Sequence, residues 1–96
     1  MTVDKRVGNS SAKMKISGWL DTQSAPELEK AINDLGPDVK ELTLDCSELE
    51  YISSAGLRLL VEAYKKMAGN VILRHVSAEI MSVIKMTGLD KRLIFE

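Results

Sequence analysis

Apolar and polar residues alternate near the start of the chain, in two short runs that are separated by turn-forming residues. In the second run, residues 12–16, Met14 and Ile16 point to one face of a strand, and the lysines beside them point to the other. The first run covers residues 3–7, and the sequence GNSS lies between the two at residues 8–11. Turn residues between two alternating runs predict a β-hairpin.

Three later segments carry apolar residues at helical spacing. The first helix is expected to begin at Ser24, where Glu27 would complete a capping box, and to stop at residues 36–37, a Gly-Pro pair. The second is expected from about residue 54 to residue 67, and the third from residue 77 to a glycine at residue 88. The stripe of the second helix that we expect to be buried consists of Leu57, Leu60, Val61 and Tyr64.

Short apolar runs between these helices predict the remaining strands. Glu41–Cys46 is expected to form a strand with one apolar face, and the continuous run Val71–Leu73 is typical of a strand covered on both faces. Residues 93–95 form either a last edge strand or a packed tail. Because strands and helices alternate after the hairpin, we expect an α/β fold: a mixed, mainly parallel sheet of four to five strands with about three packed helices. Residues 1–96 are expected to form one domain.

Composition and charge exclude several classes of function. The chain has 45% apolar and 28% charged residues and a formal net charge of −1, with no basic block, so we expect no nucleic-acid partner. No apolar run approaches the ~20 residues of a membrane span, and the N-terminus lacks the apolar segment of a signal peptide. Cys46 is the only cysteine, so no intrachain disulfide can form. A cytoplasmic protein without a membrane partner is expected.

The connection between the predicted strand that holds Leu44 and the second helix ends in two serines, Ser53 and Ser54. Loops at the carboxyl ends of strands carry function in open α/β sheets. Backbone N–H groups at a helix N-terminus lack intrahelical partners and favour an anion there. A serine at this point is a natural helix cap, and it is also a place where an added phosphate would be stable yet disruptive to a docked protein. Both interpretations of Ser54, cap and phosphorylation switch, remain open from the residues alone.

Four motifs, in this order along the chain, resemble the STAS family of bacterial anti-sigma factor antagonists and sulfate transporter tails. They are Gly18-Trp19-Leu20-Asp21, Leu44-Asp45, Tyr51-Ile52-Ser53-Ser54-Ala55-Gly56-Leu57 and Met86-Thr87-Gly88-Leu89. The resemblance implies that Ser54 is phosphorylated by an anti-sigma factor that is also a serine kinase. The unphosphorylated protein would bind that anti-sigma factor and free a sigma factor, and a metal-dependent serine/threonine phosphatase would reset the phosphorylated form. The best-studied members carry Asp where this chain has Ser53, which makes Ser53 a second candidate acceptor.

The same resemblance implies a partner-binding surface around the switch. Its expected members are Asp21, Ser53, Ser54, Ala55, Gly56 and Arg58. Each of them has a structural alternative: Asp21 as a turn former, Gly56 as a point of close packing on the sheet, and Arg58 as a solvated helix residue. Asp45 is expected to shape the loop after it, and Trp19 to pack, unless Trp19 is exposed beside the switch and acts as a binding hot spot.

An enzyme is not expected. A serine nucleophile at Ser54 needs a base. His75, the only histidine, follows the strand Val71–Leu73 and could reach the same edge of the sheet as Ser54. No nucleophile elbow surrounds Ser54, and one histidine and one cysteine far apart make no metal site. We therefore predict no catalytic residue, no metal and no cofactor, and we expect a monomer.

Two alternatives to the switch remain. The chain could be a constitutive structural or sensory STAS subunit of a larger complex, for example a transport complex, or it could be a sensor of a small ligand.

Overall fold

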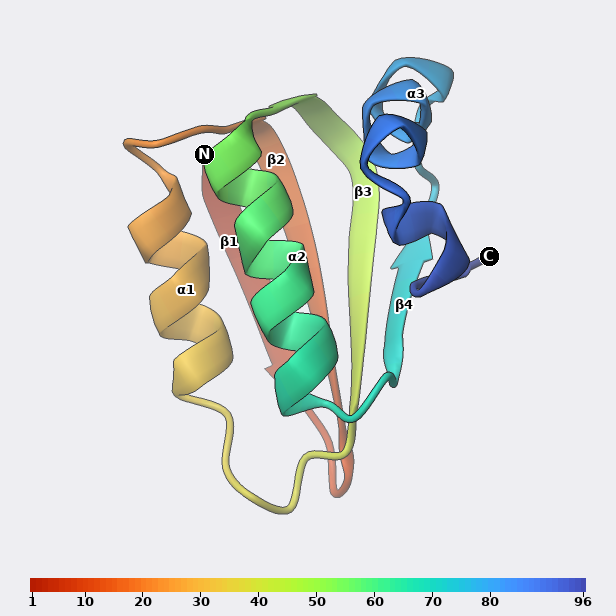
Figure 1. Ribbon diagram of the computed structural model, residues 1–96. Helices are drawn as coiled ribbons and strands as arrows, with labels where there is room; N and C mark the ends of the chain where they lie inside the picture. The colour runs from red at the N-terminus through yellow and green to blue at the C-terminus, as the bar shows by residue number, and fades with distance from the viewer.

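A computed structural model describes residues 1–96 (Figure 1). It contains five strands, three α-helices and one short 3-10 helix. Along the chain these elements are β1 (Thr2–Val7), β2 (Ser11–Leu20), α1 (Ala25–Asn33), β3 (Glu41–Ile52), α2 (Ser54–Lys66), β4 (Val71–Arg74), α3 (Ala78–Thr87), η1 (Leu89–Lys91) and β5 (Ile94–Phe95).

The strands form one mixed sheet in the order β1-β2-β3-β4-β5. β1 and β2 pair antiparallel, whereas β2–β3, β3–β4 and β4–β5 pair parallel. The predicted hairpin and the mainly parallel sheet are therefore confirmed. Ile94 and Phe95 pair with β4, so the end of the chain is an edge strand rather than a packed tail.

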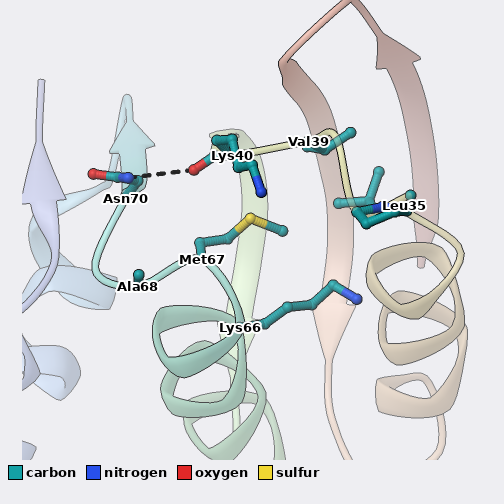
Figure 2. Close-up of a pocket in the computed structure, with 9 residues that line it drawn as sticks. Leu35, Val39, Lys40, Lys66, Met67, Ala68 and Asn70 are labelled. Atoms are coloured by element: carbon teal, nitrogen blue, oxygen red, sulfur yellow. Dashed lines mark hydrogen bonds between the residues drawn. The ribbon is translucent and has the colours of Figure 1, made fainter.

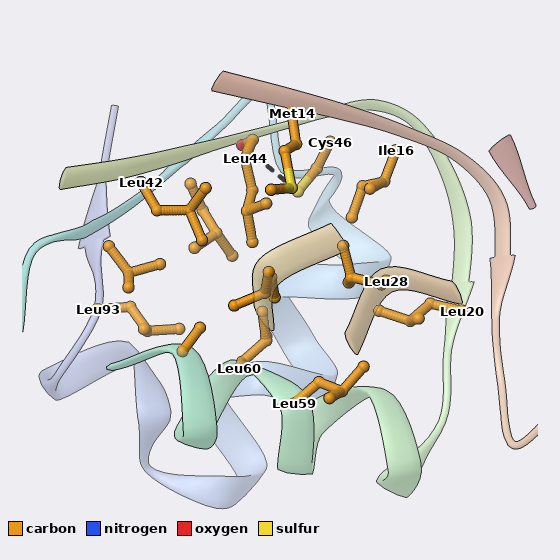
Figure 3. Packing of buried hydrophobic residues seen from close by; sticks show 14 of the residues in the cluster. Met14, Ile16, Leu20, Leu28, Leu42, Leu44, Cys46, Leu59, Leu60 and Leu93 are labelled. Carbon is orange, nitrogen blue, oxygen red and sulfur yellow. Dashed lines mark hydrogen bonds between the residues drawn. The ribbon is translucent and has the colours of Figure 1, made fainter. Parts of the chain in front are cut away.

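The helices pack on one face of the sheet and leave the other face to solvent (Figures 1 and 3). Met14, Leu42 and Leu44 point towards the helices and have no exposed surface. This arrangement contradicts the prediction that β4 is covered on both faces. Val71 and Leu73 are buried, but Ile72 lies between them on the opposite face and is only half-buried, because no helix covers that side.

β3 is longer than predicted, because the segment after Cys46 that the sequence suggested as a loop continues as a strand to Ile52. It stays paired with β2, which itself runs on to Leu20. Two shifts of register between these strands change the apolar period from two to three, so that Leu49 and Ile52 still turn into the core. An alternation rule that expects a period of two fails here because the strand is bulged.

α2 is rotated about its axis relative to the prediction. Its buried residues are Gly56, Leu59, Leu60 and Ala63. Of the predicted stripe, only Leu60 is fully buried, and the other three members (Leu57, Val61 and Tyr64) are half-buried at the edge of the core. The small residues Gly56 and Ala63 explain the rotation, because they let the helix backbone approach the sheet closely on that side. A Cβ added at Gly56 would lie only 2.7 Å from Cγ1 of Ile52.

The first helix does not use the predicted capping box. Ser24 has α-helical dihedral angles and makes no cap hydrogen bond to α1. The helical conformation already begins in the preceding turn, where Ala25 N donates to the Asp21 carbonyl at 2.8 Å. Asp21 takes the capping role one turn earlier: its Oδ1 accepts from Gln23 N at 3.1 Å and from Ser24 N at 3.0 Å. For α3, by contrast, the predicted ends are confirmed, with a cap at Ser77 and a left-handed glycine at residue 88.

None of the helices has both the length and the apolar character needed to cross a membrane.

Candidate functional site

The two predicted serines lie at the carboxyl ends of β2 and β3, at the top of Figure 1. We call this edge, with the first turn of α2, the rim; it comprises Trp19, Asp21, Tyr51, Ser53 and Ser54. Ser53 N donates to the Leu20 carbonyl at 2.9 Å, which ties the start of α2 to the end of β2. Trp19, Asp21, Tyr51 and Ser53 line one shallow, open depression.

The adjacent serines have different roles. Ser53 has extended dihedral angles, and its Oγ accepts from Gly56 N at 3.4 Å, so Ser53 is the cap of α2. Ser54 is the first residue of the helix and is exposed. Its hydroxyl forms no hydrogen bond within the protein, which leaves it free for chemistry or for a partner.

One carboxylate oxygen of Asp21 accepts hydrogen bonds from the turn that follows it. Hydrogen bonds from Ser24 N, then from the Ser24 hydroxyl (3.0 Å), and from Gln23 N hold the pKa of the Asp21 carboxyl below its usual range. The same hydroxyl lies 2.6 Å from the Trp19 carbonyl, so its single hydrogen is shared between that oxygen and Oδ1 of Asp21. The carboxylate thus fixes the β2–α1 turn beside Ser53. The three hydrogen bonds that it accepts all go to Oδ1.

The other predicted members of the partner-binding surface differ in how far they are exposed to solvent. Arg58 is exposed and lines a groove together with Ser54, and half-buried Ala55 lines a smaller hollow between α1 and α2. Gly56 is buried, with Leu20 and Ile52 side chains where its Cβ would be. The structure supports the packing interpretation of Gly56, and a contact from it to a partner remains a prediction.

An exposed aromatic pair at the rim is the feature that the sequence did not reveal. Trp19 is 57% exposed and Tyr51 44% exposed, and their ring centroids lie 5.0 Å apart. The two residues are partners in the β2–β3 register, immediately after a register shift. Tyr51 carried no signal of its own, because its pairing with Trp19 depends on the two bulges. The exposure of Trp19 fulfils the condition under which it was expected to act as a hot spot.

His75 and Asp45 are engaged with each other instead of with Ser54. Nδ1 of His75 lies 3.1 Å from Oδ1 of Asp45, and Ser47 N donates to the same oxygen at 3.0 Å. The Ser47 backbone N–H, with His75 beside it, lowers the pKa of Asp45 to about 2. Asp45 therefore shapes the bulge that follows it, as expected. Burial raises the pKa of the Cys46 thiol to about 12, so this group is not a reactive thiolate.

Two larger hollows flank the ends of α2. A groove of about 620 Å³ runs from Ser54 along α2 to η1, and a cavity of about 450 Å³ lies at the opposite end of the helix (Figure 2). No three His, Cys, Asp or Glu side chains converge as metal ligands would.

Comparisons with known proteins agree on the family. The family profile described as "Mlab, STAS domain" matches residues 3–95. The anti-sigma-B factor antagonist of Bacillus subtilis is 26% identical over 92 residues, which cover 93% of this chain and 84% of that protein. The crystal structure of an anti-sigma factor antagonist from Mycobacterium paratuberculosis superimposes with a TM-score of 0.85 at 28% identity, covering 98% of this chain and 83% of the other.

The structure of the Bacillus cell fate determinant SpoIIAA in its phosphorylated form is also similar to this chain, at 18% sequence identity. Its TM-score of 0.76, over 99% of this chain and 91% of the other, shows the shared fold. With its mixed five-stranded sheet, three helices and matching profile, this chain belongs to the STAS domain family.

Proposed function

We propose that this protein is an anti-sigma factor antagonist whose binding is switched by phosphorylation of Ser54. In the unphosphorylated state it binds an anti-sigma factor that is also a serine kinase. Phosphorylated Ser54 releases that partner, and a metal-dependent serine/threonine phosphatase restores the binding form. The docking surface is the rim together with Arg58, which lies about one turn further along α2.

The observation that carries the proposal is that only one of the two serines, Ser53, has a structural role. Ser53 already caps α2, so Ser54 can take a phosphate without the loss of a cap. Its position at the helix N-terminus stabilises a surface anion by about 0.3–1 kcal/mol. A dianion that is buried without a counter-charge beneath a docked protein costs several kcal/mol, on the order of the cost of an unpaired buried charge. The cost to the complex exceeds the gain to the free protein, so the phosphate dissociates the partner and leaves the fold intact.

The relatives support the same role. Both the Bacillus subtilis protein and the Mycobacterium paratuberculosis structure are anti-sigma factor antagonists, and each aligns over most of its length with this chain. The exposed Trp19–Tyr51 pair beside Ser53 gives the rim the kind of aromatic anchor that dominates protein interfaces.

A constitutive STAS subunit is the alternative that a specific observation favours. The family profile carries the description "Mlab, STAS domain", and Ser53 replaces the Asp that precedes the phosphorylated serine in well-studied antagonists. A subunit of this kind would bind its partner without any effect of charge at residue 54.

Intact-mass measurement after incubation with the serine kinases of the same cell tests the proposal. We expect one added phosphate on the wild type and on Ser53→Ala, none on Ser54→Ala, and weaker capture of the kinase by the phosphorylated form. Loss of the phosphate only in Ser53→Ala would move the switch by one residue. No phosphate on any form, with partner binding unchanged in Ser54→Asp, would leave the constitutive subunit as the function.

A further inference from the structure

We propose that the groove between α2 and η1 binds an amphipathic acidic helix of the partner protein, and that a phosphate on Ser54 competes with this helix for Arg58. The inference rests on the proposed function, because it names the partner segment that the switch controls. We call this hollow the α2 groove; it is the one of about 620 Å³ that begins at Ser54.

The floor of the α2 groove is apolar. Leu57, Val61 and Tyr64 line it from α2, and Leu89 lines it from η1. The three α2 residues are those that the helical pattern predicts to be buried, yet the fold leaves them half-buried. Because they follow one another at spacings of four and three residues, they form a continuous stripe on one face of the helix. These residues pack against the edge of the core, and the part of the stripe that the core leaves uncovered is available to a partner.

The border of the α2 groove is cationic. Arg58 and Lys65 stand on α2 and Arg92 on the opposite wall, and no Asp or Glu lines the groove. None of these three cations forms an ion pair within the protein. In a chain with a formal net charge of −1, three unpaired cations around an apolar floor are a local concentration of positive charge. The complementary ligand has an apolar stripe bordered by carboxylates.

The length of the groove favours a helix as that ligand. The lining residues of α2 run from Ser54 to Lys65, a span of about 17 Å at ~1.5 Å rise per residue. About three turns of a partner helix match this span, and an apolar helix face in a groove between helices is a common mode of recognition.

Ser54 connects the groove to the switch. It lines one end of the α2 groove, four residues before Arg58 and therefore on the same face of the helix. A phosphate there carries a charge of about −1.5 to −2, pairs with the nearest guanidinium and repels the carboxylates of a docked helix. Phosphorylation thus removes a binding group from the groove in addition to obstructing the rim.

The test uses the intact protein, labelled with ¹⁵N, and a synthetic, stapled amphipathic helix of about three turns. The probe carries leucines at i, i+3, i+4 and i+7 and glutamates on both borders, and its control has lysines in place of the glutamates. We expect the glutamate probe to shift the amide signals of Leu57, Val61 and Leu89, and we expect the lysine control to bind at least about tenfold more weakly.

Charge variants separate the groove from the rest of the surface. Arg58→Glu and Ser54→Glu are each expected to weaken binding of the glutamate probe by about tenfold. Lys66→Glu is the matched control, because Lys66 is exposed on the same helix but lines the cavity at its other end. Its affinity for the probe is expected to equal that of the wild type.

Several outcomes overturn the inference: equal affinity for both probes, shifts centred outside the α2 groove, or groove shifts caused by phosphatidylglycerol vesicles and not by the glutamate probe. None of these measurements needs a kinase. If Ser54 is never phosphorylated but the probe binds as expected, the proposed switch fails and the groove stands. If phosphate on Ser54 releases the partner but no probe occupies the groove, the inference fails alone.

Discussion

The two ends of α2 both lie beside a hollow, but they differ in what their polar groups already bind. At the C-terminal end, backbone and amide groups beside the cavity of about 450 Å³ are paired within the fold, whereas the ammonium groups of Lys40 and Lys66, which also line it, form no ion pair (Figure 2). Nδ2 of Asn70 donates to the Lys40 carbonyl at 3.3 Å, Leu42 N donates to the Asn70 carbonyl at 3.0 Å, and Lys40 N donates to the Ser10 carbonyl at 2.7 Å.

At the N-terminal end, three exposed side chains have no partner within the fold. The Ser54 hydroxyl has no partner, Arg58 forms no ion pair, and the ring of Trp19 is more than half exposed. A hollow alone therefore does not identify the functional end of this molecule. Unpaired cations occur at both ends, so the features that distinguish the N-terminal end are the free hydroxyl of Ser54 and the exposed aromatic surface, which a partner can satisfy and the fold does not.

The largest difference between the two ends should appear in partner binding when an exposed apolar side chain is removed from each. Trp19→Ala is expected to weaken binding of the anti-sigma factor by about 30-fold, since a hot-spot residue contributes about 2 kcal/mol or more. Val7→Ala is the control: Val7 is 54% exposed and lies next to the hairpin turn at the opposite end. Titration calorimetry measures both. Equal affinities of the two variants would show that the aromatic pair is not part of the docking surface.

The next difference concerns stability and compares a glycine from each end. In Gly56→Ala the new Cβ would lie 2.7 Å from Ile52 Cγ1 and 2.8 Å from Leu20 Cγ, and neither atom is the free end of its buried side chain. Overpacking of this kind costs about 1–3 kcal/mol, and the gain in helix propensity offsets at most about 1 kcal/mol of it. We expect urea denaturation to show a net loss of about 1–2 kcal/mol in the free energy of unfolding. In Gly36→Ala no atom lies within 4 Å of the new Cβ, so its free energy of unfolding should stay at or above that of the wild type. A similar loss in both variants would contradict the close approach of α2 to the sheet.

Local sequence chemistry predicted where most elements begin and end. Serines, glycines and prolines mark the starts and stops of the helices, and these signals act over a few residues, so one sequence suffices to find them. The position of Ser53 and Ser54 at the start of α2 followed from the same signals. The errors came where distant segments decide the outcome: β3 extends to Ile52 because β2 pairs with it, and α2 turns Gly56 to the sheet because a glycine allows the backbone to approach.

The candidate site shows the same limit. The sequence placed Asp21, Ser53 and Ser54 at one edge of the sheet, and the structure brings them together there. It gave no indication of the Trp19–Tyr51 pair, which depends on two register shifts, or of the α2 groove, which depends on the rotation of α2 and on η1. Both are products of packing between elements, which a periodic pattern within one element does not contain.

The adjacent serines permit a smaller but sharper comparison within the N-terminal end itself. Ser53→Ala is expected to lower the free energy of unfolding by about 0.5–1 kcal/mol, because it removes the acceptor of Gly56 N, and the 3.4 Å length of that bond argues for the lower part of the usual range. Ser54→Ala removes a hydroxyl with no partner and is expected to leave stability unchanged within about 0.5 kcal/mol. Thermal and urea unfolding of both variants measure the difference. A greater loss in Ser54→Ala would mean that the free serine is the structural one, and the switch would then have to be sought at Ser53.

A last comparison, which appears only in how stability changes with pH, separates a carboxylate that the fold uses from one that it does not. Ser47 N and His75 lower the pKa of Asp45 to about 2, below the ordinary value of an aspartate carboxyl, so Asp45 stabilises the folded state at pH values above its unfolded pKa. That contribution is lost as the pH falls from about 4 through about 2, where the folded protein also takes up the proton. Asp38, in the loop at the opposite end, is exposed and forms no ion pair. Urea midpoints measured at pH 7, 4 and 2 should therefore fall less steeply with acid for Asp45→Asn than for the wild type, and Asp38→Asn should follow the wild type. If all three proteins lose stability in parallel, the bond between Asp45 and Ser47 does not hold the bulge of β3, and the register that brings Tyr51 beside Trp19 must depend on other contacts.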